Sequence, residues 1–420
     1  MIDASIAYKL LYDHFGYTEF RIGQKELILS LMSGRDTVGI MPTGAGKSLC
    51  YEIPAISSSG IAIVVSPLIS LMNNQVHALV NLGIAAAYYN SSLSAAQCNK
   101  MLKNMTDGAY KIIYVAPERL KNEEFLSACA AIEISYVIVD EAHCVSEWGQ
   151  DFRPSYSEIP DFIKRLSKRP VIGAFTATAT EKVRDDIIHL LGLNNPLILT
   201  TGYDRPNLYF SVINTKSNTD RIKKLKDILD SRKGKSGIIY CSTRKSADEL
   251  YSLLLKDKYS VTHYHAGLTN DEREKNQSDF IKNNKNIIVA TNAFGMGIDK
   301  PDIEFVIHHN IPKNIEGYYQ EAGRAGRNGE NAECIILYMP SDVSIVKSII
   351  DNTQNQTPQK RRAEYMRLNK MVDYVNISGC LRNYILNYFG EAVAAPCGNC
   401  SSCTERSKRI KKAKKTLDRS

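Results

Sequence analysis

The sequence lacks any long uninterrupted apolar run. None reaches the roughly 18–20 residues that a transmembrane helix needs, and residues 1–11 do not form a basic segment followed by an apolar one, as a secretory leader does. Hydrophobic residues make up 44% of the chain and charged residues 23%, which is typical of a globular protein in water. We therefore expect an intracellular protein with no membrane partner.

The chain also lacks net charge over most of its length. Residues 341–420 hold 15 Lys and Arg against 7 Asp and Glu, and so carry the whole net charge of +8. Seven of the ten residues in 406–415 are basic, which makes this tail a candidate for binding phosphate groups. A solvated tail that binds nothing specific would have the same composition.

Six of the ten cysteines are scattered singly, as reduced thiols in a cytosolic protein usually are. The other four are clustered, namely Cys380, Cys397, Cys400 and Cys403. Two overlapping C-x-x-C pairs and a fourth cysteine upstream provide the four soft ligands of a closed, structural Zn²⁺ site. An iron–sulfur cluster is the alternative, whereas a catalytic zinc site would need an open position.

A chain of 420 residues is long enough for two or three domains. Over residues 2–193, short β-branched runs alternate with helical patterns, which predicts a mainly parallel sheet wrapped by helices. The predicted strands are Thr37–Met41, Ile61–Val65, Lys111–Val115, Tyr136–Val139 and Val171–Phe175.

A second alternating series follows a predicted connection at Asn194–Pro206, and a helical, basic region begins after Pro340. The strands predicted for this series are Gly237–Tyr240, Val261–Tyr264, Asn286–Ala290, Phe305–His308 and Glu333–Tyr338. A polar stretch at residues 352–360 is predicted to be a linker or turn. The predicted division is two α/β domains at 1–195 and 196–340, a helical zinc-binding module at 341–405 and a basic tail at 406–420.

A candidate phosphate cradle follows the first predicted strand. In Met41-Pro42-Thr43-Gly44-Ala45-Gly46-Lys47-Ser48, the glycines allow backbone N–H groups to face phosphate oxygens at a helix N-terminus. Lys47 would reach the β- and γ-phosphates and Ser48 would ligate Mg²⁺, with Thr43 also in contact with the nucleotide. Met41 occupies the first glycine position of the strict motif. A glycine-rich turn that binds nothing is the alternative for this segment alone.

Two carboxylates follow a later strand, as hydrolysis of a phosphoanhydride requires. Asp140 would hold Mg²⁺ through its water shell, and Glu141 would orient and deprotonate the attacking water. Arg324 and Arg327 would stabilise the charge that develops on the γ-phosphoryl oxygens. Their i, i+3 spacing predicts one face of a helix that also carries Gln320, although two ordinary surface arginines would show the same spacing.

Four segments resemble motifs I, II, III and VI of superfamily 2 helicases. They are Met41–Ser48, Asp140–His143, Thr176–Thr178 and Gln320–Arg327. In these helicases methionine is ordinary at the motif position that Met41 occupies here. Residues 15–24, residues 147–154 and the cysteine cluster narrow the resemblance to the RecQ family of DNA helicases, over roughly residues 5–405.

The resemblance implies a fold of two tandem RecA-like parallel-sheet domains followed by a small helical zinc-binding module. It implies an ATP-dependent 3′→5′ DNA helicase of repair or recombination that needs ATP, Mg²⁺ and Zn²⁺. Tyr17 and Arg21 would stack on the adenine and Gln24 would read its edge. The expected partners are single-stranded DNA and tailed or forked duplex DNA. We expect a monomer in the bacterial nucleoid or the eukaryotic nucleus.

The resemblance also implies where DNA binds. Ser66, Arg119 and Thr291 lie in segments similar to motifs Ia, Ib and V, at the ends of predicted strands. Trp148, Phe152 and Arg153 lie in a segment that resembles the aromatic-rich loop through which the family couples DNA binding to hydrolysis. The resemblance therefore implies DNA contacts from six residues, namely Ser66, Arg119, Trp148, Phe152, Arg153 and Thr291. A hydrophobic plug between domains is the alternative for the loop, in which Gln150 stands where the family often has histidine.

Two other functions fit the same motifs. An RNA helicase is one, because Asp-Glu-Ala-His does not distinguish the sugar. An ATP-gated DNA-binding or remodelling module that never unwinds is the other. RecQ proteins usually continue into a winged-helix domain, whereas this chain stops at Ser420, so we expect a short family member or a truncated form in which ATPase activity is better supported than robust unwinding.

Overall fold

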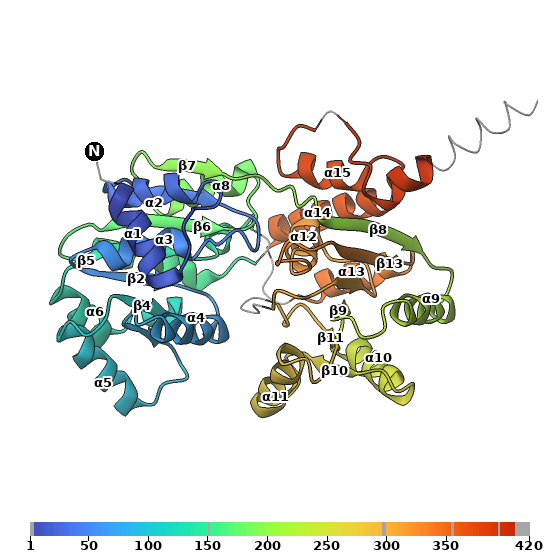
Figure 1. The fold of residues 1–420 in the computed structure, drawn as a ribbon, viewed down its shortest axis with the longest axis horizontal. Helices are drawn as coiled ribbons and strands as arrows, with labels where there is room; N and C mark the ends of the chain where they lie inside the picture. Colours follow the sequence, from blue (N-terminus) through green and yellow to red (C-terminus); the bar gives the residue numbers. More distant parts are fainter. Residues whose placement is uncertain (1–3, 150, 296–299, 354–356, 394, 408–420) are drawn as a thin grey trace, which may run out of the picture. The chain divides into compact units, whose positions relative to one another are not determined.

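A computed structural model describes residues 4–149, 151–295, 300–353, 357–393 and 395–407. The chain divides into two compact units, Met1–Gly202 and Tyr203–Ser420. Each unit is built around its own sheet, and helices cover that sheet (Figure 1). Among the described helices, none combines the length and apolar character needed to cross a bilayer.

The first unit contains a seven-stranded sheet with the order β3-β4-β2-β5-β6-β1-β7, and every neighbouring pair is parallel. Its strands are β1 Thr37–Ile40, β2 Ile61–Val65, β3 Ala86–Tyr89, β4 Ile112–Val115, β5 Ile134–Val139, β6 Val171–Thr176 and β7 Leu197–Thr200. The central strands are buried on both faces, which explains why they read as continuous apolar runs in the sequence.

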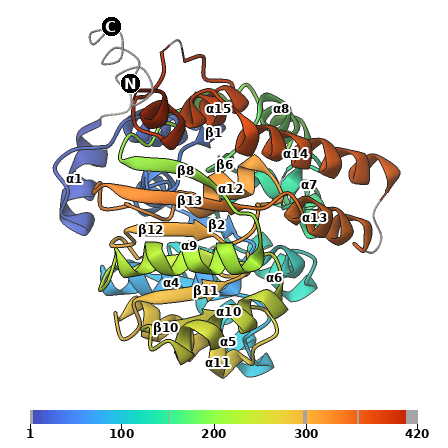
Figure 2. The ribbon, with the colours of Figure 1, turned by 90° about the vertical axis from the view of Figure 1, so that its right-hand side faces the viewer.

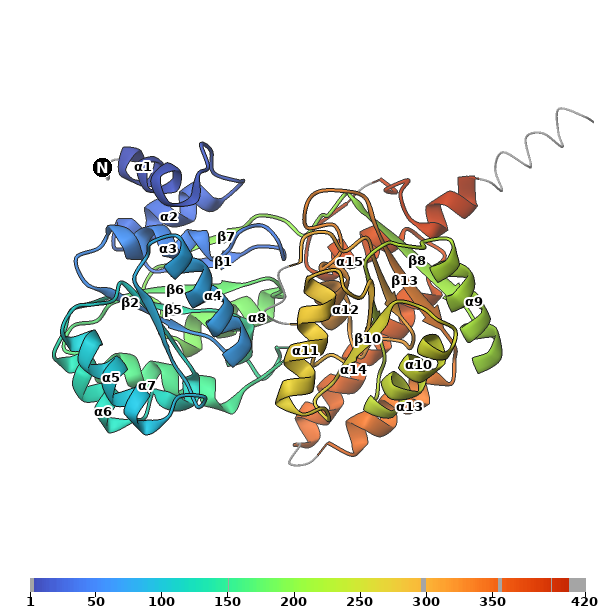
Figure 3. The same ribbon diagram turned by 60° about the horizontal axis from the view of Figure 1, so that its bottom comes forward.

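Helices lie on both faces of this sheet. They are α1 Ala4–Phe15, α2 Gln24–Met32, α3 Leu49–Ser57, α4 Ile69–Asn81, α5 Ala95–Thr106, α6 Glu123–Ala130, α7 Ile159–Lys164 and α8 Glu181–Leu190, with 3₁₀ turns η1 Pro117–Arg119, η2 Ala142–Val145 and η3 Pro154–Glu158. Alternate strand residues such as Ala62 and Val64 join one core with α1–α4. Figure 3 shows α1–α3 on one side of the strands and α5–α7 on the other.

The second unit contains a six-stranded parallel sheet with the order β10-β11-β9-β12-β13-β8. Its strands are β8 Leu208–Asn214, β9 Gly237–Tyr240, β10 Val261–Tyr264, β11 Ile287–Ala290, β12 Phe305–His308 and β13 Ala332–Tyr338. Its helices are α9 Asn218–Asp230, α10 Arg244–Lys256, α11 Asn270–Ile281, α12 Ile315–Ala322, α13 Asp342–Asp351, α14 Pro358–Asn376 and α15 Leu381–Tyr388. Figure 2 shows α9 and α10 in front of this sheet and α15 beyond its β8 edge.

The predicted pair of parallel sheets is confirmed, but three strands were not predicted. They are β3, β7 and β8. The predicted connection at 194–206 is wrong in part, because β7 lies within it and pairs with β1. The alternating, half-exposed pattern of β7 is that of an edge strand, and its partner is about 160 residues away, so no local signal in the sequence distinguishes it from a loop. The predicted linker at 352–360 overlaps the start of α14, and residues 354–356 lie outside the described residues.

The carboxylate of Asp36 ties three segments of the first unit together immediately before β1. Its two oxygens accept hydrogen bonds from the backbone N–H groups of Ile172 at 2.9 Å and Asn194 at 2.7 Å. They also accept two from the Arg169 guanidinium, at 3.2 and 2.5 Å. Asp36 therefore sets the starts of β1, β6 and β7 relative to one another.

We predict that Asp36→Ala lowers the free energy of unfolding of the first unit by about 3–5 kcal/mol, because it leaves a guanidinium and two backbone N–H groups unpaired in a partly buried site. Urea denaturation monitored by hydrogen exchange in residues 36–40 and 171–176 measures the change. The matched control is Asp185→Ala, which removes an exposed carboxylate paired with Arg184 and should change the same quantity by less than about 1 kcal/mol.

Candidate nucleotide and zinc sites

The loop between β1 and α3 has the backbone of a phosphate cradle. Gly44 and Gly46 adopt left-handed φ angles of 87° and 81°, which strain any residue with a side chain. A Cβ atom on Gly46 would also lie 2.5 Å from the side-chain nitrogen of Gln24. The two glycines are therefore required by the conformation of the loop, as the sequence predicts.

The residues expected around the adenine are attached to this loop. The Gln24 amide donates to the carbonyls of Ala45 at 3.2 Å and Gly46 at 3.1 Å, and its oxygen accepts from the Arg21 backbone N–H at 2.8 Å. The Arg21 guanidinium donates to the Gly44 carbonyl at 2.6 Å. Gln24 is buried and Tyr17 is 56% exposed, so the carboxamide supports the loop while the aromatic ring remains open to stacking.

The two predicted catalytic carboxylates lie where β5 ends, and one of them contacts the cradle lysine. Lys47 Nζ is 3.5 Å from Glu141 Oε1. Glu141 adopts φ 48° and ψ 48°, a left-handed conformation that is rare outside glycine and costs on the order of 1 kcal/mol or more. Such strain persists only where surrounding contacts impose it, and it is concentrated at functional sites.

Asp140 is suited to a cation. Burial raises the pKa of its carboxyl to about 6, while the positive charge of Lys47 acts in the opposite direction. A divalent cation favours the ionised form of a buried carboxylate more strongly than one ammonium group does. Asp140, together with Ser48 at the start of α3, therefore has the chemistry to hold Mg²⁺.

His143 connects the carboxylates to β6, a role that the sequence analysis did not assign. Its Nδ1 is 2.8 Å from Thr176 Oγ1 and 3.3 Å from Glu141 Oε2. The Thr176 hydroxyl can donate to the Thr178 carbonyl at 3.2 Å. Burial lowers the pKa of His143, so its ring is held neutral. The partner of His143 lies 33 residues further along the chain, so sequence spacing alone does not reveal it.

The aromatic-rich loop is bonded directly to the backbone of this site. The Tyr156 hydroxyl donates to the Asp140 carbonyl at 2.9 Å, and the Arg153 guanidinium donates to the Pro67 carbonyl at 2.7 Å. Trp148 is 37% exposed, and the Lys182 ammonium lies 3.0 Å from its ring centroid. Phe152 is half-buried, and Gln150 lies outside the described residues.

The other predicted DNA contacts differ in exposure. Ser66 is buried, and its hydroxyl has no hydrogen-bond partner among the described residues. The Arg119 guanidinium donates to the Asn90 carbonyl at 3.2 Å and lies over the ring of Tyr89. Thr291 is buried at the end of β11, and residues 296–299 of the same segment lie outside the described residues.

The predicted helix face for Arg324 and Arg327 is wrong. Helix α12 ends at Ala322 and residues 323–328 form turns, with φ 57° at Gly326. We call residues 323–330 the arginine turn. Gly326 cannot continue the helix in this conformation, so the i, i+3 spacing places the arginines on a turn. Gln320 lies in α12, and Arg324 is 4% exposed.

The four clustered cysteines converge on one point, because their sulfur atoms all lie within 4.8 Å of one another. Burial acts to raise the pKa of Cys380, but backbone N–H groups of Cys397 and Asn383 outweigh it and lower the value to about 7. Burial raises the pKa of Cys397 to about 12. Four adjacent thiolates repel one another unless a cation binds them, so this donor set fits Zn²⁺ in a closed tetrahedral site.

A second cluster of potential ligands contains Asp248, His263 and His265. The Gly267 backbone N–H donates to His265 Nδ1 at 3.1 Å, so the proton of the neutral ring is on Nε2. That nitrogen is 2.7 Å from Asp248 Oδ1 and donates to it. The cluster is therefore a hydrogen-bonded His–Asp pair, whose Nε2 is not available to a metal.

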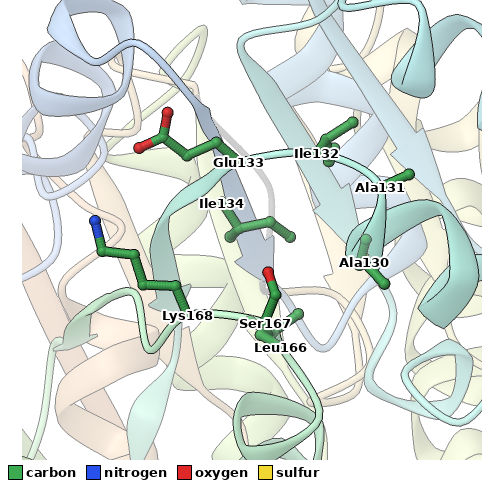
Figure 4. Close-up of a pocket in the computed structure, with 9 residues that line it drawn as sticks. Ala130, Ala131, Ile132, Glu133, Ile134, Leu166, Ser167 and Lys168 are labelled. Atoms are coloured by element: carbon green, nitrogen blue, oxygen red, sulfur yellow. The ribbon is translucent and has the colours of Figure 1, made fainter.

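A pocket of about 460 Å³ lies at the opposite end of the first sheet from the cradle. It is lined by residues 129–134, before and at the start of β5, and by residues 166–168 after α7 (Figure 4). Parallel α/β sheets bind ligands at the carboxyl ends of their strands, whereas this pocket is at an amino end. It contains none of the predicted site residues.

Three protein-family models match consecutive parts of the chain. Residues 21–187 match the DEAD/DEAH box helicase model, residues 220–329 match the helicase conserved C-terminal domain, and residues 340–404 match the RecQ zinc-binding model. The first two cover most of the two sheets, and the third contains the cysteine cluster.

Sequence comparisons with individual proteins agree with the family-model matches. The chain is 44% identical over 393 residues to the ATP-dependent DNA helicase RecQ of Bacillus subtilis, covering 93% of this chain and 66% of that protein. It is 41% identical over 342 residues to a B. subtilis protein named a probable ATP-dependent DNA helicase RecS, covering 81% of this chain and 68% of that protein. The chain spans 61–66% of the length of the bacterial RecQ proteins that it matches.

A solved structure shares the fold at low sequence identity. The crystal structure of the DUF1998 helicase MrfA bound to DNA superposes with a TM-score of 0.67 and 18% identity, over 94% of this chain and 60% of that one. The family models and close relatives together show that this chain belongs to the RecQ family of ATP-dependent DNA helicases, with two RecA-like parallel-sheet domains followed by a helical zinc-binding region.

Proposed function

We propose that the chain hydrolyses ATP, moves 3′→5′ along single-stranded DNA and separates duplexes in DNA repair or recombination. The observation that carries the proposal is the contact of Lys47 in the cradle with Glu141 beside the buried Asp140. Membership in a family of DNA helicases supports DNA as the polymer on which the motor would act.

The first unit supplies binding and proton transfer. The cradle residues Thr43, Gly44 and Gly46 would bind phosphate oxygens, and Lys47 would neutralise the β- and γ-phosphates. Glu141 would orient the attacking water and accept its proton, with His143 holding the carboxylate in place. Mg²⁺ bound by Ser48 and Asp140 would neutralise charge on the phosphates.

Other residues would sense the nucleotide and the DNA. Gln320, Arg324 and Arg327 would contact the γ-phosphoryl group, whose charge increases during transfer. Tyr17 and Arg21 would stack on the adenine and Gln24 would read its edge, and Gln24 also supports the cradle through its bond to the Ala45 carbonyl. The DNA contacts would come from Ser66, Arg119, Trp148, Phe152, Arg153 and Thr291. The bond from Tyr156 to the Asp140 carbonyl would make the aromatic loop sensitive to the state of the carboxylates.

An ATP-gated remodeller is the second candidate function, and the same ATP site supports it. The chain covers 66% of the length of the B. subtilis RecQ protein, and the Lys47–Glu141 contact supports ATP turnover in both candidate functions. The two functions differ in one measurable outcome, the displacement of a DNA strand.

We predict that Glu141→Gln lowers the single-stranded-DNA-stimulated kcat by about 10²–10⁴-fold, because the amide cannot accept the proton of water. Nucleotide binding should persist in this variant, whereas Lys47→Ala should lose both binding and turnover. ATPase assays without polymer, with single-stranded DNA and with RNA measure these effects. The matched control is Glu133→Gln, at the far end of β5. Stimulation by RNA alone, or turnover that survives both site substitutions, would contradict the assignment.

We predict that the protein displaces the paired strand from a duplex with a 3′ single-stranded tail and leaves a 5′-tailed duplex intact, because translocation has one polarity. A gel assay with ATP and with a non-hydrolysable analogue measures displacement. Rapid ATP turnover with no displacement on either substrate would favour the remodeller.

We predict one zinc ion and no iron per chain by elemental analysis of the purified protein. Cys400→Ser should lose most of the zinc and lower the thermal stability of the second unit, because metal binding contributes directly to the folding of such modules. The matched control is Cys334→Ser, a buried thiol in β13 outside the cluster, which should retain one zinc ion. Iron in stoichiometric amount would identify the cluster as iron–sulfur instead.

A further inference from the structure

We propose that Arg205 and Arg382 are positioning residues that hold the arginine turn, and that the zinc-binding region acts on this turn through them. The inference rests on the proposed ATPase function, since the placement of Arg324 and Arg327 matters for turnover only if they act on a phosphate. Both positioning residues and the turn belong to the second compact unit.

The arginine turn depends on side chains outside it. Backbone N–H groups at the start of the turn donate to the last carbonyls of α12, those of Tyr319, Glu321 and Ala322. The carbonyls of the turn itself are bound by side chains from the segment before β8. The Arg205 guanidinium donates to the carbonyls of Gly323 at 3.2 Å, Ala325 at 3.0 Å and Gly326 at 2.9 Å. One planar group therefore binds three carbonyls on both sides of Arg324.

Asn207, two residues further on, completes this contact. Its amide donates to the carbonyls of Gly326 at 2.9 Å and Glu330 at 2.8 Å, while its oxygen accepts from Arg205 Nε at 3.3 Å. A Cβ atom on Gly326 would lie 2.5 Å from this amide nitrogen. The segment 203–208, which we call the bracing segment, thus fits the arginine turn closely along its length.

The zinc-binding region holds the bracing segment from its other side. Arg382 lies two residues after Cys380, in the first turn of α15, and is 4% exposed. Its guanidinium donates to Asp204 Oδ1 at 2.6 Å, to the Arg205 carbonyl at 2.5 Å and to the Leu208 carbonyl. The bracing segment is therefore bonded to the zinc-binding region through two backbone carbonyls and the Asp204 carboxylate, and to the arginine turn through the side chains of Arg205 and Asn207.

Further contacts join the zinc-binding region to the bracing segment. Asn399, between the clustered Cys397 and Cys400, donates to the Pro206 carbonyl at 3.1 Å. Tyr203 stacks on Phe389 at 4.4 Å between ring centroids. Asn399 lies between Cys397 and Cys400, and Arg382 follows Cys380 by two residues. Zinc bound by these cysteines would therefore fix the spacing of the groups that hold the bracing segment.

The test uses Arg205→Lys, which retains the charge but loses the fork that binds three carbonyls. We expect the single-stranded-DNA-stimulated kcat to fall about 10–100-fold, as misplacement by about 1 Å does in other sites. The KM for ATP and the zinc content should stay within about twofold of the wild type. Amide hydrogen exchange in residues 323–330 should become faster, a readout that does not depend on activity. Arg382→Lys should increase exchange in both 203–208 and 323–330.

A combined mutant identifies the route of the effect. If Arg205 acts through the turn, Arg205→Lys should cause no further loss of kcat in a background that lacks both turn arginines, Arg324→Ala with Arg327→Ala. The matched control is Arg221→Lys, which weakens a buried ion pair with Asp342 in the same unit at 2.8 Å. It should lower stability while leaving kcat and exchange in 323–330 unchanged.

Two results would overturn the inference. One is unchanged exchange in 323–330 in both Arg205→Lys and Arg382→Lys, and the other is an equal loss of kcat from Arg205→Lys with and without the arginine pair Arg324 and Arg327. Absence of ATP turnover in the wild type would instead refute the proposed function, and the exchange measurements would still decide whether these residues hold the turn.

Discussion

The candidate site of the first unit depends on the parallel register of β1, β6 and β5. Ile40 is paired with Thr176, and Ala174 is paired with Val139. The three strands therefore end at the same edge, where the cradle, the Thr-Ala-Thr segment and the carboxylates follow them. A shift of one residue would turn each strand's side chains to the other face, so burial on both faces protects this alignment. The Asp36 contacts reinforce it at the opposite ends of the strands.

This alignment brings ionisable groups into a buried environment that they would otherwise avoid. Asp140 is buried with a raised pKa, His143 is held neutral, and Glu141 has a strained backbone. Each feature costs folding free energy, and such costs are concentrated at functional sites. The Lys47–Glu141 contact offsets part of this cost by pairing two opposite charges.

In the second unit, the corresponding constraint is that the arginine turn has to be held in place by side chains, because it is not part of a helix. Helix α12 ends at Ala322, Gly326 adopts a left-handed φ in the turn that follows, and the Arg205 guanidinium binds carbonyls of that turn. The zinc-binding region is packed against the other side of the bracing segment. The cysteine cluster is remote in sequence from Arg324 and Arg327, yet two layers of hydrogen bonds connect its region to the turn that carries them.

The sequence by itself determined the α/β class, the glycine-rich loop after β1, the carboxylate pair after β5 and the cluster of four cysteines, because each is a local pattern with a definite backbone or donor set. The family resemblance that it carries is confirmed. Only the tertiary structure decided that β7 and β8 exist, that Gln24 supports the cradle and that His143 contacts Thr176. It also decided that Arg324 and Arg327 lie on a turn held by Arg205. These features depend on contacts between residues that are tens to hundreds of positions apart in the chain. Such contacts produce no periodic pattern in the local sequence, so they could not be predicted from it.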